Sequence, residues 1–599
     1  MHFLLSTVVL HTAILCTAVS NPGQRPFSDD SRAKILNTRV NAAIISILKE
    51  FKTPGGVGVA VVQQSQDSGW RIETRGYGLA KVDGAMVTDD TLFAIGSNSK
   101  LFDVLATGLL ISNETLSPRI SWNTKIASVM PEWGLMDPVA SSETTIQDAM
   151  SHRTGLPRHD FILHADVGTV SETIGRLRYL KPSTGFRELW QYNNFIYTVL
   201  SYFPPLLTGI PFETYVNDFI LQPLGMNSTT YFSKTAADSG NLADGMARDG
   251  VNQIEDVFGL GRVRAYPFWS PNEGNPGSVI SGPGGLISNA KNMAIWLQTL
   301  LSEGRNPVDG EIVIPEDVIC RVAAGVTVVV PAAQFPELSP VVYGGGQMRG
   351  TYRGFEFIEH GGTVPGFKSQ ITRIPNQNFG VAVLSNDESF GFQIAEAVKF
   401  RIIDEVLDLE MIDWSARFKS LITAQFNERP IPTPRSPNPT LPSIAFSALA
   451  GTYRDPGYGI LELCFISPEN LIASASESCR QLIDEIPTIL PATLDPHIPT
   501  LLARWKGFRI THVYLAHFEQ NLFNLTSVLS IPTGNSSDKP YWVQKNSHPN
   551  FVAEFSFEGT VGVGLRGLWG PGEGVESPRG ESVEDRAEVW FAKIDDDDR

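Results

Sequence analysis

A strand-like segment passes into a helical one at Phe93-Ala94-Ile95-Gly96-Ser97-Asn98-Ser99-Lys100. Ser97 would open the helix, where free backbone N–H groups and a positive partial charge stabilise a developing oxyanion. Lys100 follows one turn later and returns to the same helix face. A lysine in a desolvated pocket loses its proton more readily and can act as a base for the hydroxyl. The segment therefore predicts a serine nucleophile, with a helix-capping serine beside a surface lysine as the alternative.

The spacing Ser-x-x-Lys does not by itself identify the nucleophile, because the chain contains it five times. The five copies begin at Ser31, Ser46, Ser97, Ser288 and Ser536. Three of the others lie in or at the start of amphipathic helical patterns, where a surface lysine is ordinary, and the fourth lies in a polar loop. Ser97 differs because it follows a strand-like segment and a glycine and opens a helix.

Two further short motifs follow along the chain. Tyr192-Asn193-Asn194 lies roughly ninety residues after Ser97, and His360-Gly361-Gly362 leads into a predicted strand. A second Tyr-x-Asn, Tyr215-Val216-Asn217, lies inside a helical pattern and is interpreted as structural. In their order, the three motifs resemble those of the serine β-lactamase and penicillin-binding-protein superfamily, in its class C-like branch. The chain is similar to a fungal-type secreted β-lactamase-like protein.

The resemblance covers about residues 30–410 and includes the segments 151–157, 223–229 and 284–288. It implies an α/β domain of the β-lactamase/transpeptidase-like fold, in which helices flank an antiparallel sheet and a helical subdomain is added. Hydrophobic periodicity predicts strands over 57–62, 70–77, 355–358, 369–374 and 380–384. It predicts helices over 31–51, 100–112, 145–151, 195–207, 212–221, 290–302 and 392–407.

The resemblance also implies a role for each residue of the first two motifs. Ser97 would attack the substrate carbonyl and become acylated. Lys100 and Tyr192 would share the general-base role and return the proton to the leaving group, while Asn194 would orient Lys100 and the substrate. This chemistry needs no metal or other cofactor, and the ten histidines are scattered without metal-binding spacing.

The third motif carries a histidine where many relatives have a lysine. By the resemblance, His360 would present its ring to the substrate or to Tyr192, and Gly361 and Gly362 would line the bound substrate. The backbone N–H groups of Ser97 and Thr363 would form the oxyanion hole. Because a neutral histidine holds a carboxylate less firmly than a lysine does, we expect no efficient hydrolysis of β-lactam antibiotics.

These observations predict a serine hydrolase of the peptidase, amidase or esterase type, acting on a small-molecule or peptide acyl substrate. One alternative is an acyltransferase that uses the same acyl-enzyme. Another is a non-catalytic secreted ligand-binding protein. The absence of a Gly-x-Ser-x-Gly motif weakens an α/β-hydrolase interpretation.

The chain of 599 residues has a net charge of -17 and no run of lysines or arginines, which argues against nucleic acid or an anionic membrane as a partner. Residues 1–20 resemble a signal peptide with an apolar segment too short to span a bilayer, although a buried strand is the alternative. No later segment has the pattern of a membrane span. We therefore expect a secreted protein, cleaved before Asn21.

Asparagine and cysteine positions fit an oxidising, secretory compartment. Asn-x-Ser/Thr sequons occur at Asn113, Asn227, Asn524 and Asn535. Cys464 and Cys479 lie close together in sequence and are predicted to form a disulfide. Cys16 leaves with the signal peptide, so Cys320 is expected to be a lone, buried small hydrophobe.

Length and composition divide the mature chain into parts. We assign 21–427 to the β-lactamase-like domain and 428–445 to a proline-rich linker, because closely spaced prolines forbid helix and interior strand. Residues 446–599 show short alternating segments separated by glycine and proline, which predict a separate all-β domain. That domain resembles the lipocalin-like domain appended to many such hydrolases.

Overall fold

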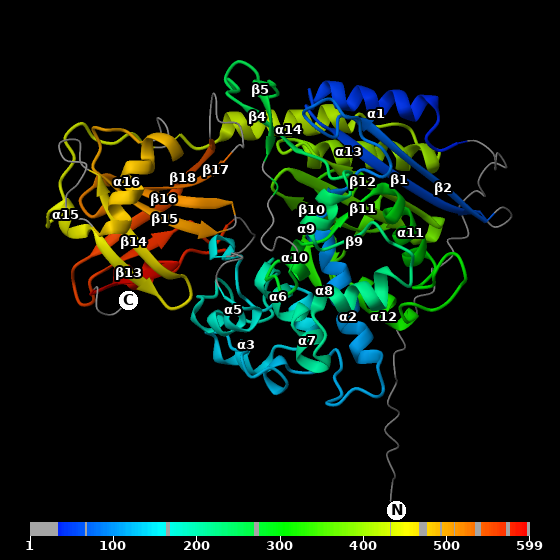
Figure 1. Ribbon diagram of the computed structural model, residues 1–599, viewed down its shortest axis with the longest axis horizontal. Helices are drawn as coiled ribbons and strands as arrows, with labels where there is room; N and C mark the ends of the chain where they lie inside the picture. Colours follow the sequence, from blue (N-terminus) through cyan, green and yellow to red (C-terminus); the bar gives the residue numbers. More distant parts are fainter. Residues whose placement is uncertain are drawn as a thin grey trace, which may run out of the picture.

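The computed structural model describes residues 34–65, 69–162, 168–266, 268, 275–431, 433–466, 476–490, 494–507, 509–532, 541–570 and 575–595. The predicted signal peptide and the sequon at Asn535 lie outside the described residues. The side chains of the other three sequons, Asn113, Asn227 and Asn524, are exposed. An α/β domain and an all-β domain lie next to each other, as Figure 1 shows.

An eight-stranded sheet, in the order β2-β1-β12-β11-β10-β9-β8-β7, forms the centre of the α/β domain. The first half consists of β2 (Gly69–Gly78), β1 (Gly56–Ser65), β12 (Phe379–Ser385) and β11 (Phe367–Ile374). The second half consists of β10 (Phe355–Val364), β9 (Met348–Tyr352), β8 (Val341–Tyr343) and β7 (Thr327–Val330). All neighbouring strands are antiparallel. β1 pairs with β12 from Val57↔Ser385 to Gln63↔Phe379, so the two ends of the domain complete one sheet.

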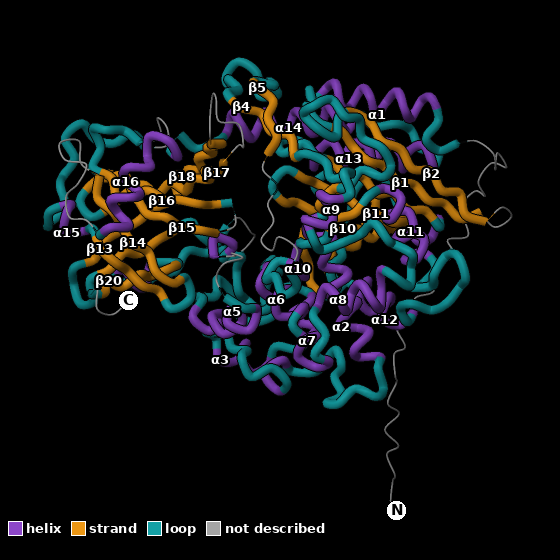
Figure 2. The backbone as a smooth tube through the Cα atoms, viewed as in Figure 1, coloured by secondary structure: helices purple, strands orange, loops and turns teal. Residues whose placement is uncertain are grey.

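Helices cover both faces of this sheet, as Figure 2 shows. Val57 and alternate residues after it in β1 face the core beneath α1 (Thr38–Glu50) and α13 (Gly391–Val406). Ala60 points to the other face, where α11 (Ala290–Leu301) and the helical subdomain pack. This alternation follows from the two-residue period of a strand. Burial on both faces explains why β1 reads as a nearly continuous apolar run.

The helical subdomain surrounds α2 (Ser99–Ser112), whose residues are buried on almost every side. The predicted helix over 195–207 is two helices, α6 (Asn194–Ser201) and α7 (Phe203–Thr208), because two prolines at the start of α7 cannot donate to the end of α6. The predicted helix over 212–221 becomes α8 (Phe212–Val216) and a π-helical turn. The other helices are α3 (Pro138–Glu143), α4 (Ile146–Met150), α5 (Val170–Arg176), α9 (Ser233–Asp238), α10 (Ser281–Gly284) and α12 (Glu316–Ala323).

Among the described residues, no single helix is long and apolar enough to cross a bilayer. One pair, Asn194–Thr208 with Phe212–Leu221, meets the length and hydropathy criterion when its members are taken together, and an 84° bend separates them. Most side chains of α6 lie in the core of the helical subdomain.

The all-β domain is a closed eight-stranded antiparallel barrel, as predicted. Its strands are β13 (Gly451–Asp455), β14 (Gly459–Ile466), β15 (Thr500–Gly507), β16 (Ile510–Glu519), β17 (Leu522–Pro532), β18 (Tyr541–Ser556), β19 (Gly562–Arg566) and β20 (Val589–Ile594). α14 (Trp414–Glu428) ends the α/β domain, and α15 (Phe446–Leu449) precedes β13. The described residues between these two helices form neither helix nor strand. A short helix, α17 (Val583–Arg586), precedes β20.

The cysteines confirm one expectation and correct another. Cys464 of β14 is joined to Cys479 by the predicted disulfide. Cys479 lies on α16 (Glu477–Ile489), a helix that the β-pattern of this region did not predict. Cys320 is buried on α12 as expected, but it is disulfide-bonded, so the expectation of a lone thiol is wrong. No cysteine of the described residues is free.

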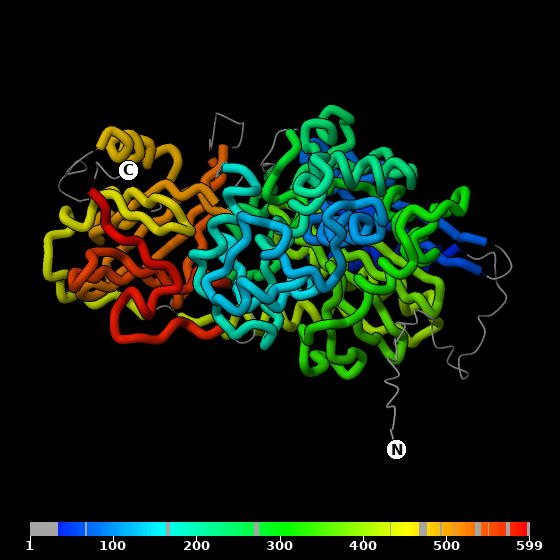
Figure 3. Tube along the Cα trace, turned by 90° about the horizontal axis from the view of Figure 1, so that it is seen from below, coloured from blue at the N-terminus to red at the C-terminus, as the bar shows by residue number. Residues whose placement is uncertain are grey.

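Several segments of the α/β domain pack against the barrel. The hairpin of β4 (Gly245–Asp249) and β5 (Arg262–Tyr266) places the Tyr266 ring 6.0 Å from that of Trp542. His159 shares a 2.7 Å hydrogen bond with Tyr458 of the barrel. In Figure 3 the cyan part of the chain lies next to the barrel.

Candidate active site

Ser97 lies at a strand-to-helix junction, as the sequence predicts. β3 (Phe93–Ala94) ends just before a 3₁₀ turn over Gly96–Asn98, and α2 begins at the next residue. Gly96 has a φ of 54°, and a side-chain carbon there would come 2.7 Å from the backbone nitrogen of Thr363. Only glycine therefore allows this turn to lie against β10.

The other described serines with the Ser-x-x-Lys spacing form hydrogen bonds away from the cavity that contains Ser97. The hydroxyl of Ser288 is buried and shares a 2.8 Å hydrogen bond with Thr229. Ser46 lies on α1 and donates to Glu50 over 2.9 Å at the surface. Ser31 and Ser536 lie outside the described residues. The context that selects Ser97 in the sequence therefore also separates it from Ser46 and Ser288 in the structure.

Lys100 is completely buried, and its amine lies within reach of three oxygens. The Nζ atom is 3.2 Å from Ser97 Oγ, 2.7 Å from Asn194 Oδ1 and 2.8 Å from the carbonyl oxygen of Pro283. Removal from water lowers the pKa of Lys100 well below its usual range, although the nearby carboxylate of Asp160 acts in the opposite direction. The alternative of a surface lysine is thus excluded.

Tyr192 contacts the same hydroxyl from the other side. Its Oη atom lies 2.6 Å from Ser97 Oγ. Burial raises the pKa of Tyr192 to about 12, so the phenol keeps its proton at neutral pH and donates to Ser97. The structure therefore brings the first two predicted motifs together around one oxygen atom.

Backbone and histidine contacts hold the segment that carries Tyr192. The N–H of Gln191 donates to the carbonyl of His152 over 2.7 Å, and the N–H of Asn193 donates to His152 Nδ1 over 3.2 Å. The His152 ring is fully buried and lies 4.6 Å from the Tyr192 ring. Because these bonds flank Tyr192 on both sides, His152 acts as a structural support.

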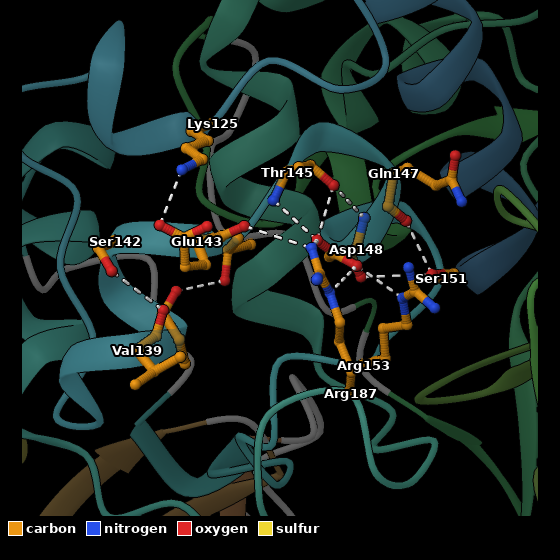
Figure 4. A network of polar contacts seen from close by, with 12 residues as sticks. Lys125, Val139, Ser142, Glu143, Thr145, Gln147, Asp148, Ser151, Arg153 and Arg187 are labelled. Atoms are coloured by element: carbon orange, nitrogen blue, oxygen red, sulfur yellow. Dashed lines mark hydrogen bonds and ion pairs between the residues drawn. The ribbon is translucent and has the colours of Figure 1, made fainter. Parts of the chain in front are cut away.

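A charged network joins the part of the chain before Tyr192 to α4, as Figure 4 shows. The buried carboxylate of Asp148 accepts hydrogen bonds from Arg153 at 2.6 Å and from Arg187 at 2.7 Å. It also accepts from the side chain of Thr145 at 2.7 Å. These contacts lower the pKa of Asp148 although burial opposes them. Two guanidinium groups on one ionised carboxylate thus tie the loop before Tyr192 to the helical subdomain.

His360 forms hydrogen bonds that the motif did not predict. Its Nδ1 atom lies 2.5 Å from the carbonyl oxygen of Gly361, which can only accept, so Nδ1 carries the proton. The Nε2 atom then accepts from the hydroxyl of Tyr343, 3.0 Å away. Both ring nitrogens are therefore occupied, and the rings of His360 and Tyr192 are 6.5 Å apart. The ring lines the cavity that contains Ser97 without a hydrogen bond to Tyr192, and its contact with a substrate stays a prediction.

The glycines of the third motif allow a close approach of β10 to the nucleophile turn. A side-chain carbon on Gly362 would lie 1.9 Å from the carbonyl oxygen of Ile95. Gly361 and Thr363 line the same cavity as Ser97, which has a volume of about 500 Å³. The predicted oxyanion-hole residues, Ser97 and Thr363, thus border one cavity.

Two residues without any motif complete the surroundings of the nucleophile. Asp160 accepts a 2.8 Å hydrogen bond from Asn194 Nδ2, which leaves Asn194 Oδ1 directed at Lys100. The guanidinium of Arg158 lies 4.5 Å from the centre of the Tyr192 ring and 3.4 Å from Asp160. Both come from a loop that has no periodicity, so the sequence carried no signal for either.

The fold and the site together define a serine hydrolase of the β-lactamase-like type. The sequence model of the Beta-lactamase family matches residues 45–400, and the chain belongs to this family. Unguisins hydrolase ungD of Aspergillus violaceofuscus is 30% identical over 453 residues, which cover 70% of this chain and 75% of the relative. Unguisins hydrolase ungD' of Aspergillus campestris is 29% identical over 431 residues, covering 70% and 76%.

A solved structure shows the same fold over most of the chain. The octameric penicillin-binding protein homologue from Pyrococcus abyssi has a TM-score of 0.50 and 19% sequence identity. The match covers 88% of this chain and 98% of that protein. At this identity the likeness concerns the fold alone, and it agrees with the fold class that the motifs predict.

Proposed function

We propose that this protein is a secreted serine hydrolase that cleaves an amide or ester bond through an acyl-enzyme on Ser97. One observation carries the proposal: Ser97 Oγ lies between a buried lysine amine at 3.2 Å and a tyrosine hydroxyl at 2.6 Å. Membership of the β-lactamase family supports it. Two fungal relatives named as hydrolases of unguisins also support hydrolysis as the outcome.

The contacts of Lys100 suit a general base. A neutral amine has two N–H donors and one lone pair, and Asn194 Oδ1 and the Pro283 carbonyl are both acceptors. The lone pair then faces Ser97 Oγ. Ser97 Oγ accepts a hydrogen bond from Tyr192 and lies 3.2 Å from Lys100 Nζ, so a neutral Lys100 is placed to take the Ser97 proton as the oxygen attacks a carbonyl.

Acylation follows from this arrangement in two steps. Ser97 Oγ attacks the carbonyl carbon while its proton passes to Lys100, and the resulting oxyanion accepts hydrogen bonds from the backbone N–H groups of Ser97 and Thr363. The carbon–nitrogen or carbon–oxygen bond then breaks as Tyr192 donates its proton to the leaving group, and protonated Lys100 restores that proton. In deacylation a water molecule gives its proton to the neutral Lys100 and attacks the carbonyl carbon of the acyl-enzyme. The ester bond to Ser97 Oγ then breaks, the proton returns to Ser97, and the acid is released.

The cavity walls disfavour a substrate carboxylate next to the third motif. Glu359 and Glu396 line the cavity and both pair with Lys399, at 3.0 Å and 2.8 Å. Burial raises the pKa of Glu396 to about 7. The ring of His360 is neutral, since burial lowers its pKa to about 3. Because Glu359 and Glu396 share one lysine and Glu396 is only partly ionised near neutral pH, this end of the cavity offers no surplus positive charge to the carboxylate of a β-lactam antibiotic.

Covalent labelling tests this function and separates it from its alternatives. A fluorophosphonate probe is expected to add once to the protein, and peptide mapping should place it on Ser97. A label on Ser288, or no label on folded protein, contradicts the proposal, and the second result favours a ligand-binding protein. Product analysis with increasing hydroxylamine as acceptor distinguishes hydrolysis from acyl transfer.

Asp160 is expected to set the pH at which Lys100 becomes active. The base must be neutral, so kcat/KM rises with pH through the pKa of Lys100, and the charge of Asp160 raises that pKa. Asp160→Asn and Asp160→Ala should both move this acid limb to lower pH. Only Asp160→Ala removes the acceptor for Asn194 and should lower kcat about fivefold, because one hydrogen bond contributes about 1 kcal/mol. An acid limb at the wild-type pH in both variants would contradict this positioning role.

Secretion and glycosylation belong to the same proposal. The exposed positions of Asn113, Asn227 and Asn524 are compatible with attached glycans. Protein from the medium of a fungal host is expected to lose mass on enzymatic deglycosylation. Retention of the protein inside the cell would contradict it.

A further inference from the structure

A second cavity, of about 730 Å³, lies between the barrel and the α/β domain. It meets the cavity that contains Ser97, because three residues line both: Arg158, Asp160 and Arg509. Arg158 and Asp160 come from the loop beside Tyr192, whereas Arg509 comes from the turn between β15 and β16 of the barrel. The cavity that contains Ser97 thus adjoins a second cavity that is lined mainly by residues of the barrel.

The turn that carries Arg509 is held close to the loop that carries Arg158 and Asp160. A side-chain carbon on Gly507 would lie 2.0 Å from the carbonyl oxygen of Phe161, so the two backbones are in direct contact. The Phe161 ring packs against Trp505 and Phe551 of the barrel, with centroid distances of 6.4 Å and 6.1 Å. These contacts keep the two cavities side by side.

The lining of the barrel cavity suits a peptide. Phe161, Phe551 and Trp569 supply aromatic surface, and Asn546, His548 and Asn550 supply polar groups. The three polar residues are exposed on β18, where its register with β17 shifts between Thr526↔Ser547 and Asn524↔Val552, so they present donors and acceptors that this irregular part of the strand leaves available. An extended chain offers amide groups to these side chains and its own side chains to the aromatic surface.

The two volumes together exceed about 1,000 Å³, the upper end of pockets that hold a single small molecule. We propose that the barrel cavity binds the distal part of an extended peptide substrate whose scissile carbonyl lies at Ser97. This inference rests on the proposed function and names its substrate class. The barrel then determines which substrates are cleaved, and Arg158 and Arg509 contact the chain where it passes from one cavity to the other.

A series of peptide amides of increasing length tests this inference. Each member carries the same fluorogenic scissile bond, extended by zero, two, four or six residues on the acyl side, with a second series on the leaving-group side. We expect kcat/KM to rise at least tenfold with length in one series, mainly through a lower KM. A flat response in both series would overturn the proposal.

Filling the barrel cavity should remove this gain. Asn546→Trp and His548→Trp add bulk at exposed positions that line the cavity, and the expected ratio of kcat/KM between the longest and the shortest substrate falls below threefold. Ser547→Trp is the matched control, because Ser547 is exposed on the same strand but does not line the cavity. Its ratio should equal that of the wild type, and wild-type ratios in the two cavity variants would overturn the proposal.

A binding measurement separates this inference from the proposed function. The longest peptide amide should bind Ser97→Ala at least tenfold more tightly than the shortest one in calorimetry, and Asn546→Trp in the same background should remove the difference. If hydrolysis does not depend on Ser97 but this difference in binding persists, the proposed function fails and the barrel cavity stands. Equal binding of long and short peptides would contradict the proposed role of the barrel cavity and leave the proposed function of Ser97 unaffected.

Discussion

Replacing Ser97 with alanine is expected to lower kcat/KM on a chromogenic ester or D-amino-acid amide by about 10⁴-fold or more. No other hydroxyl lies between Lys100 and Tyr192 in the described contacts of these two residues, so no side chain can take over the attack. Removing the nucleophile of a comparable catalytic group costs as much, because the remaining residues act as a unit with it. Steady-state kinetics and labelling with the fluorophosphonate probe measure the loss.

Ser288→Ala is the matched control for this substitution. It removes a buried hydroxyl from the same Ser-x-x-Lys spacing, but that hydroxyl only contacts Thr229 in the described structure. Activity should stay within tenfold of wild type, while the lost buried hydrogen bond lowers the free energy of unfolding by about 1 kcal/mol. The opposite pattern, with full activity in Ser97→Ala and loss in Ser288→Ala, would contradict the assignment of the nucleophile.

Replacing Lys100 with methionine is expected to lower kcat/KM by about 10²–10⁴-fold, the usual contribution of a general base. Methionine keeps the length and burial of the side chain but cannot take the proton of Ser97. Lys100→Arg should lose as much, because a guanidinium stays protonated and does not become a base. The rate of covalent labelling should fall in parallel, since the lysine acts before the acyl-enzyme forms.

Lys368→Met serves as the control for removing a buried lysine. Lys368 is as buried as a core residue and pairs with Glu388 at 2.8 Å, but it does not line the cavity. Its substitution should lower stability and leave kcat/KM within tenfold of wild type. If Lys100→Met kept wild-type labelling and turnover in a folded protein, Tyr192 alone would have to act as the base.

Much of the architecture could be predicted because it depends on local patterns. Alternating and continuous apolar runs predicted β1, β11 and β12, and helical spacing predicted α2 and α13. The break between α6 and α7 was missed because apolar periodicity continues through a proline pair. The helix α16 was missed because it follows a β-patterned region. Periodicity reports which face is buried and not where the backbone bonds stop.

The site also contains residues that local motifs predict and contacts that they do not. Ser97, Lys100, Tyr192 and Asn194 were predicted from short motifs, and the structure brings all four within hydrogen-bonding distance of at least one other. The contact of His360 with Tyr343 was not predicted, since the two residues meet across strands of one sheet and share no motif. A side chain's partner depends on the whole surrounding packing, which a motif does not contain.

The sequence by itself determined the class of chemistry at Ser97, because a glycine turn, a helix start and a lysine one turn later are local features of consecutive residues. Only the tertiary structure decided that Lys100 is buried and its pKa lowered, that Asp160 orients Asn194, and that Arg509 of the barrel borders the same cavity. The physical reason is that burial and long-range contacts depend on segments hundreds of residues apart, such as β1 with β12 and the barrel turn with the loop after Pro157.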